Sequence, residues 1–231
     1  MKILCAIFAF NEEQRIKDTI AKHPKKRNYD LIIFDDGTTD GSLKNIGEKV
    51  ISNKTNKGIG YTMKKAFKYA IDNKYDIIVI TAGNNKDDAK EIPRLIKPIV
   101  NGEAEFVQGS RFLSGGLYGN MPIYRIIATK HVHPILTSIV AGKRVTESTN
   151  GFRAIKVSLL KDKAIDWKQD WLDKYELEPY LLIKAIQTKH KHMEVPCSKI
   201  YPEKKTTKMT PFVSWWNIMK PILYIGLKVK R

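Results

Sequence analysis

The sequence of 231 residues is poor in cysteine and has no long apolar run. Its two cysteines, Cys5 and Cys197, exclude a disulfide scaffold and are too few for a zinc site, so we expect free thiols in a reducing compartment. The apolar stretch in 1–13 is too short for a signal peptide and lacks a cleavage site. No uninterrupted apolar stretch reaches the roughly 20 residues of a membrane-spanning helix. We therefore expect a cytoplasmic protein, peripheral on the inner face of the cell membrane.

Acidic residues are outnumbered by basic ones, and the formal net charge is +17. Such an excess indicates an anionic partner, which can be nucleic acid, an anionic membrane or a phosphorylated substrate. The chain lacks an aromatic-and-basic RNA signature, zinc-finger spacing and a helix-turn-helix pattern, so we expect no nucleic-acid partner. A hydrophobic content of 42% is that of a folded protein with a sizeable core.

Short apolar runs alternate with helical patterns four times in the first half of the chain. The predicted strands are Ile3–Ala9, Leu31–Phe34, 49–52 and Ile77–Ile80, and the predicted helices are 11–22, 61–72 and 90–101. This alternation predicts an α/β fold, Rossmann-like, with a mostly parallel sheet covered by helices on both faces. Polar clusters follow three of the strands, and parallel strands would bring these clusters to one edge of the sheet.

Two of these polar clusters follow the first and second strands. Asn11 is expected to cap the first helix. Asp35 and Asp36 are adjacent carboxylates at a strand end, where their repulsion requires a compensating partner or a hydroxyl-rich ligand. Thr39 or Asp40 is expected to cap a helix that follows directly.

The third cluster, 82–86, follows the strand at Ile77–Ile80. Its small residues would let a ligand approach the backbone, and Lys86 adds one positive charge that suits phosphate. Taken alone, this segment reads as an ordinary strand-to-helix turn. Gly58 belongs to a glycine pair before a helix, which is a weak motif that tight packing also explains.

The second half of the chain continues the sheet and adds helices. Its predicted elements are a strand at 105–108, a glycine-rich loop at 109–116, a helix at 121–141, a turn at 149–154, a helix at 175–187 and an edge strand ending at 194–196. His131 and His133 are two residues apart and do not share a helix face, so we expect no metal site there.

The C-terminal segment 210–231 differs from the domain formed by 1–209. It carries Trp215 and Trp216, is interrupted by polar residues and ends in basic residues. This composition fits an amphipathic helical tail in the interface of an anionic membrane. The alternative is a C-terminal helix docked on the core.

Six motifs in this order resemble the family 2 glycosyltransferases, which have the nucleotide-sugar-binding GT-A fold. The motifs are FAFNEE (8–13), DDGTTDGS (35–42), NKGIG (56–60), GSRFLSGG (109–116), TNGFRA (149–154) and YELEPYLLIKA (175–185). Within the family, the chain is most similar to dolichyl-phosphate mannosyltransferases and bacterial polyprenyl-phosphate glycosyltransferases. The resemblance spans nearly the whole chain.

The resemblance also implies roles for individual residues. The donor nucleotide would contact Phe10, Glu12, Asp35, Asp36, Gly58, Ala82, Gly83 and Asn84. Catalytic roles fall to Lys86, Arg111 and Asp88, and acceptor or phosphate binding falls to Arg153, Lys130, His131 and Lys205, the last in a basic flap with Lys204 and Lys208. The alternative for Arg111 is a surface ion pair, and for Arg153 it is a structural bridge to Glu147 or Glu176.

The chain departs from the family where an Asp-x-Asp motif should hold Mg²⁺ or Mn²⁺ on the diphosphate. Ala82 and Asn84 stand at the two aspartate positions, and neither is a good ligand for a hard cation. Lys86 stands at the following polar position. We therefore expect no metal cofactor, with Asp87 and Asp88 as ligands only if the alignment slips.

Two interpretations follow. In the first, an active glycosyltransferase uses Lys86 in place of the metal and moves a sugar, with inversion, from a nucleoside diphosphate to a polyprenyl phosphate. A glycan hydroxyl is the alternative acceptor, and it would need a base such as Asp87, Asp88 or Glu176. In the second, the chain is an inactive relative that binds a nucleotide or a protein.

Overall fold

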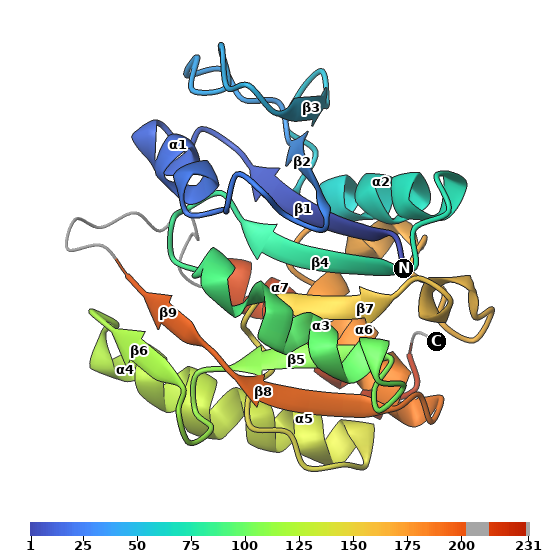
Figure 1. Cartoon of the computed structure of the whole chain (residues 1–231). Helices are drawn as coiled ribbons and strands as arrows, with labels where there is room; N and C mark the ends of the chain where they lie inside the picture. The colour runs from blue at the N-terminus through green and yellow to red at the C-terminus, as the bar shows by residue number, and fades with distance from the viewer. Residues whose placement is uncertain (202–212, 230–231) are drawn as a thin grey trace.

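A seven-stranded sheet organises the computed structural model, which describes residues 1–201 and 213–229 (Figure 1). The strand order is β3-β2-β1-β4-β7-β5-β8. The strands are β1 (Ile3–Ala9), β2 (Asp30–Asp35), β3 (Lys49–Ser52), β4 (Ile77–Ala82), β5 (Phe106–Ser110), β7 (Arg153–Lys156) and β8 (His192–Pro196). Strands β1 to β4 are parallel, and β7 runs antiparallel to its neighbours β4 and β5. The prediction of a mostly parallel sheet is confirmed.

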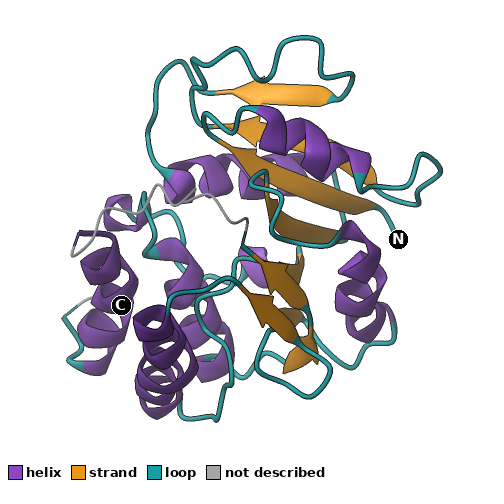
Figure 2. Cartoon of the chain, turned by 90° about the vertical axis from the view of Figure 1, so that its left-hand side faces the viewer, coloured by secondary structure: helices purple, strands orange, loops and turns teal. Residues whose placement is uncertain are grey.

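Helices cover both faces of this sheet, and Figure 2 shows them on either side of the strands. Helix α2 (Ile59–Asp72) and helix α6 (Leu177–Gln187) pack on one face, where Phe34 and Phe67 belong to the larger apolar core. Helix α1 (Gln14–Ala21) and helix α3 (Ile92–Val100) pack on the other face. The central strands are apolar on both faces because both faces are buried.

A second layer of helices follows β5. Helix α4 (Ile123–Ile127), a π-helical turn (Ala128–Val132) and helix α5 (His133–Ala141) run on from one another, as the helical pattern at 121–141 predicts. Two short strands, β6 (Leu117–Gly119) and β9 (Ser198–Ile200), form a separate parallel pair. Three short 3₁₀ turns lie at Ala89–Glu91, Leu159–Lys161 and Asp170–Leu172.

The C-terminal helix α7 (Val213–Gly226) lies against the rest of the protein. Ile222 packs with Ala141 of α5 and Ile183 of α6 in a small apolar cluster. The docked alternative therefore describes these residues, although Trp216 on the same helix is half exposed. Residues 204, 205 and 208 of the expected basic flap lie outside the described residues. Among the residues that the structure describes, no helix is long and apolar enough to span a membrane.

The polar clusters after β1 and β2 join each other, which corrects two predictions of helix caps. Asn11 does not cap α1, which begins at Gln14; instead its Oδ1 accepts hydrogen bonds from the backbone N–H groups of Thr39 and Asp40. Asp40 in turn accepts from the N–H of Glu13, and no helix follows it. These contacts hold the two loops together at the carboxyl edge of the sheet.

Candidate active site

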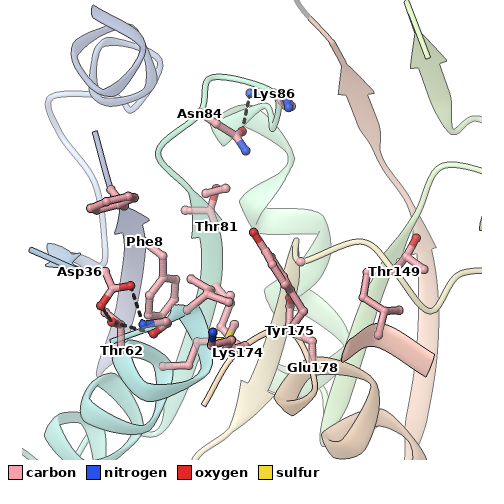
Figure 3. A pocket seen from close by; sticks show the side chains of 18 of the residues that line it. Phe8, Asp36, Thr62, Thr81, Asn84, Lys86, Thr149, Lys174, Tyr175 and Glu178 are labelled. Atoms are coloured by element: carbon pink, nitrogen blue, oxygen red, sulfur yellow. Dashed lines mark hydrogen bonds between the residues drawn. The ribbon is translucent and has the colours of Figure 1, made fainter. Parts of the chain in front are cut away.

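A cavity of about 410 Å³ lies beyond the carboxyl ends of β1 and β4, where an open α/β sheet binds its ligands (Figure 3). Asp36 and Thr62 lie at one end of it, and Asn84 and Lys86 at the other. Tyr175 and Glu178 lie across from Phe8 and Thr81. The cavity therefore brings together polar clusters that the sequence places far apart.

The predicted donor-binding residues are mostly at this cavity. Phe10, Glu12, Asp36, Gly58, Ala82 and Asn84 line it. Asp35 and Gly83 do not line it: Asp35 accepts a hydrogen bond from the Thr38 backbone, and the Gly83 N–H donates to the carbonyl of Phe8. Both residues are adjacent in sequence to lining residues, and their hydrogen bonds fix the backbone next to the cavity.

Asp36 is the anchor of the segment between β3 and α2. Its carboxylate accepts five hydrogen bonds, at 2.9 to 3.0 Å, from the backbone N–H groups of Lys57 and Gly58 and from the side chains of Asn53, Asn56 and Thr62. The carboxylate is almost completely buried, so these bonds replace its hydration. The adjacent carboxylates of the sequence therefore have different surroundings, and Asp36 has its compensating partners inside the protein.

The glycines of the NKGIG motif are required by packing. Gly58 has a φ of 112°, and a Cβ at Gly60 would lie 2.1 Å from the carbonyl oxygen of Leu172. A side chain at either position would push the 170–174 segment away from α2. This close approach brings Lys174 and Tyr175 to the cavity.

Lys86 lines the cavity from the turn after β4. The side chain is only 8% exposed, and its Nζ lies 4.4 Å from the centre of the Tyr201 ring. Burial, together with the neighbouring charges of Lys199 and Arg125, lowers the pKa of this lysine to about 8. Across residues 1–201 and 213–229, its ammonium has no carboxylate partner and no hydrogen-bond acceptor.

Asp87 and Asp88, the alternative metal ligands, are both committed elsewhere. Asp87 is buried, accepts from the Ala82 N–H and the Thr81 hydroxyl, and forms an ion pair of 2.5 Å with Lys199. Asp88 does not line the cavity, because its carboxylate caps the 3₁₀ turn by accepting from the Lys90 N–H.

Arg111 lines the cavity but is held in a buried ion pair. Its Nε donates to Glu147 at 2.7 Å, and its Nη2 donates to Thr149 at 3.0 Å. Glu147 is completely buried. Its negative charge raises the pKa of the Arg111 guanidinium, and the positive charge of Arg111 lowers the pKa of the Glu147 carboxyl. The alternative given for Arg111, a surface ion pair, is right about the pairing but wrong about its location, because the pair is buried and Arg111 itself lines the cavity.

Of the predicted acceptor-binding residues that the structure describes, Arg153, Lys130 and His131 do not line the cavity. Arg153 is completely buried in β7, where it donates to the carbonyls of Asn150 and Glu178 and lies 3.4 Å from the Glu178 carboxylate. It is a structural bridge, and its partner is neither Glu147 nor Glu176. Lys130 and His131 are exposed and do not line the cavity, and residue 205 lies outside the described residues.

Three basic residues of the cavity were missed by reasoning from the sequence: Arg125, Lys174 and Lys199. Lys199 lies on the short strand β9, and its Nζ is held by Asp87 and by the Asn150 side chain. Arg125 on α4 lines the cavity and stacks near the Tyr201 ring, 5.3 Å from its centre. None of these residues belongs to one of the six motifs, so the sequence gives no signal that their side chains reach the cavity.

The fold and this cavity define the class of protein as a glycosyltransferase of the GT-A type. The structure matches glucosyl-3-phosphoglycerate synthase from Mycobacterium tuberculosis, solved with Mn²⁺, UDP and phosphoglyceric acid, with a TM-score of 0.70 at 18% identity. The match covers 98% of this chain and 78% of that one. At this identity the likeness concerns the fold.

The chain belongs to glycosyl transferase family 2, whose family model matches residues 5–165. It is 30% identical to the UDP-N-acetylglucosamine–dolichyl-phosphate N-acetylglucosaminyltransferase of Methanococcus voltae, over 97% of this chain and 96% of that protein. It is 23% identical to the undecaprenyl-phosphate mannosyltransferase of Micrococcus luteus, over 91% of this chain and 88% of that protein. The resemblance found in the sequence motifs is confirmed.

The residues at the expected metal position do not fit a divalent cation. Ala82 offers no ligand, Asn84 offers one amide, and the carboxylate of Asp87 is taken by Lys199. In the described part of the chain, no cluster of three histidine, cysteine, aspartate or glutamate side chains could hold a metal ion.

Proposed function

We propose that this glycosyltransferase transfers a sugar from a nucleoside diphosphate to a polyprenyl phosphate, with inversion at the anomeric carbon. The observation that carries the proposal is the charge of the cavity. Five basic side chains line it: Lys86, Arg111, Arg125, Lys174 and Lys199. The acidic side chains that line it among the described residues are Glu12, Asp36 and Glu178. Such an excess suits two phosphorylated substrates.

In the proposed reaction, an oxygen of the acceptor phosphate attacks the anomeric carbon from the side opposite the leaving group. The bond between that carbon and the diphosphate oxygen breaks, and its electron pair leaves with the nucleoside diphosphate. The product is a polyprenyl phosphate sugar of inverted configuration. A phosphate monoester, with a second pKa near 6, is already an anion at neutral pH, so this attack needs no general base.

The carboxylates of the site favour a phosphate acceptor over a glycan hydroxyl. A hydroxyl would need a base, and Asp87, Asp88 and Glu176 are the residues expected to supply one. Asp87 is paired with Lys199, and Asp88 caps a turn. Glu176 is 2% exposed and paired with Lys220 at 3.1 Å, so its charge is committed to α7.

The surface beside the cavity fits a lipid acceptor. Ile123, Ile127, Ile135 and Ile139 on α4 and α5 are between 53% and 76% exposed, and Lys130 and His131 are exposed among them. Arg125 on the same helix lines the cavity. Exposed apolar side chains with neighbouring cations suit the interface of an anionic membrane, and Trp216 on α7 would add to this contact.

Vesicle flotation tests this membrane contact. The full-length protein should float with phosphatidylglycerol-containing vesicles at low salt, and salt should weaken the binding. Replacing Ile127 and Ile135 together by serine should release the protein. Thr137→Ser, at a buried position of α5, is the control for damage to the helix. Flotation of the double variant at the wild-type level would exclude α4–α5 as the contact.

The function itself is tested by acceptor-dependent release of nucleoside diphosphate. UDP- and GDP-sugars are each incubated with the full-length protein and either a short-chain polyprenyl phosphate or an oligosaccharide. Release should require the lipid phosphate and persist in EDTA. Release that depends on the oligosaccharide alone would transfer the proposal to a hydroxyl acceptor, and no release with any pair would favour the inactive, nucleotide-binding interpretation.

A further inference from the structure

The turn between β4 and α3 carries the ammonium of Lys86 close to the positions at which the family resemblance implies a metal-binding Asp-x-Asp motif. Lys86 is buried, faces the cavity and has no anionic partner within the described chain. Removing a lysine from water without a partner is costly, and the lowered pKa of about 8 expresses that cost. A ligand with negative charge would remove this cost on binding.

A second ammonium completes the arrangement. Lys199 reaches the same cavity from β9, and its Nζ is fixed by the Asp87 carboxylate and, at 3.0 Å, by the Asn150 side chain. Its charge contributes to lowering the pKa of Lys86, so the two ammonium groups act on the same space. Lys199 also pairs with Asp87, a carboxylate of the turn whose charge acts on Lys86.

We propose that Lys86 and Lys199 form a two-ammonium site that binds the donor diphosphate and takes the place of a divalent cation. This inference rests on the proposed function, because it assumes that the anion in the cavity is the diphosphate of the donor. Lys86 donates hydrogen bonds to the phosphate oxygen that gains charge as the bond to the sugar breaks. Lys199 donates its remaining N–H to the same diphosphate, with its position set by Asp87 and Asn150.

The Tyr201 ring also lines this site and lies against two of its cations. The ring centre lies 4.4 Å from the Lys86 Nζ and 5.3 Å from the guanidinium carbon of Arg125. The face of an aromatic ring stabilises a cation without neutralising it. Tyr201 therefore holds Lys86 in place while leaving its N–H groups available to phosphate.

Binding alone tests this proposal, without any need for turnover. Titration calorimetry with UDP and with GDP, each in EDTA and each in excess Mg²⁺, should give the same affinity within about twofold for the preferred nucleotide. Lys86→Gln should weaken that affinity about 10-fold to 100-fold, the value of one charged hydrogen bond. Lys90→Gln, an equal charge change on an exposed residue outside the cavity, is the matched control and should bind as wild type.

Lys199 needs a paired design because its loss leaves Asp87 buried without a partner. The double variant Lys199→Gln with Asp87→Asn keeps the two side chains neutral and hydrogen-bonded, and it should fold but bind nucleoside diphosphate at least about 10-fold more weakly. Double-variant affinity equal to that of the wild type would remove Lys199 from the site.

The pH dependence supplies an independent readout. The groups that face Lys86 are Lys199, Arg125, Glu12 and Asp87, together with Tyr201. Because the pKa of Lys86 is about 8, the wild-type affinity should fall between pH 8 and 9.5 as its ammonium is lost, and Lys86→Gln should be flat over this range.

The outcomes separate this inference from the proposed function. Metal-independent binding that depends on Lys86, without sugar transfer, would uphold the site and overturn the function. Sugar transfer that requires Mg²⁺ or Mn²⁺ would uphold the function and overturn the site. Wild-type affinity in Lys86→Gln would also overturn the site.

Discussion

Replacing Asp36 by asparagine should make the protein easier to unfold, because its buried carboxylate accepts five hydrogen bonds. The asparagine side chain keeps the size of aspartate but turns one oxygen into an NH₂ group. In the less damaging orientation this group faces the Gly58 N–H and the Asn56 amide, two donors that the second carboxylate oxygen now accepts at 2.9 and 3.0 Å. The Gly58 N–H then has no acceptor, and the remaining bonds lose their charge.

The size of the effect follows from these bonds. A hydrogen bond to a charged group contributes roughly 1.5–3 kcal/mol, and a buried donor left unsatisfied costs about 1–3 kcal/mol. We expect Asp36→Asn to lower the free energy of unfolding by about 2–4 kcal/mol. Asp35→Asn is the matched control, because Asp35 accepts from the Thr38 N–H alone through its side chain; we expect it to cost less than about 1.5 kcal/mol.

Urea unfolding followed by circular dichroism measures both variants. A shift of the midpoint for Asp36→Asn with an unchanged slope would show lost stability without a change in the surface exposed. The expectation drawn from the sequence, that Asp36 contacts the nucleotide, makes the opposite prediction for this variant. If its stability equals that of the wild type while its affinity for nucleoside diphosphate is lost, the structural role of Asp36 is refuted.

Three further perturbations have defined outcomes. Glu147→Gln leaves the buried guanidinium of its partner arginine uncompensated and should lower the free energy of unfolding by about 3–5 kcal/mol, measured by urea titration. Gly60→Ala places a methyl group 2.1 Å from a backbone oxygen, so it should lower the melting temperature clearly more than alanine at Gly102, whose surroundings are open. Burial lowers the pKa values of His23, His133 and His192 to about 4, so between about pH 6.5 and 4 the unfolded chain binds protons that the folded chain does not. The free energy of unfolding should therefore decrease as the pH is lowered from about 6.5 to 4, and a free energy that stays constant over this range would contradict the expectation.

The first four strands could be predicted from the sequence because they are buried on both faces. A continuous apolar run such as Ile77–Ile80 carries that information locally, and the structure extends it only to Ala82. The polar clusters after the strands could also be placed at one edge of the sheet, because the carboxyl ends of parallel strands meet there. Lys86 could be identified as a candidate site residue because it stands at the polar position that follows the altered Asp-x-Asp motif.

The arginines and the loop caps could not be predicted, because their partners are distant in the sequence. Arg153 reads as a phosphate ligand in its motif, but β7 inserts antiparallel between β4 and β5 and buries it completely. Asn11 has the residue type of a helix cap, but its side chain bonds to a loop 28 residues away. Lys199 reaches the cavity only through the placement of β9, which its short sequence does not specify.

The most direct test of the account is mass spectrometry of the lipid after incubation with the full-length protein, a nucleotide sugar and a short-chain polyprenyl phosphate in EDTA. We expect a product whose mass equals the polyprenyl phosphate plus one sugar residue, with nucleoside diphosphate released in equal amount. If the lipid mass stays unchanged across UDP- and GDP-sugars, with and without Mg²⁺ or Mn²⁺, sugar transfer to a polyprenyl phosphate is contradicted.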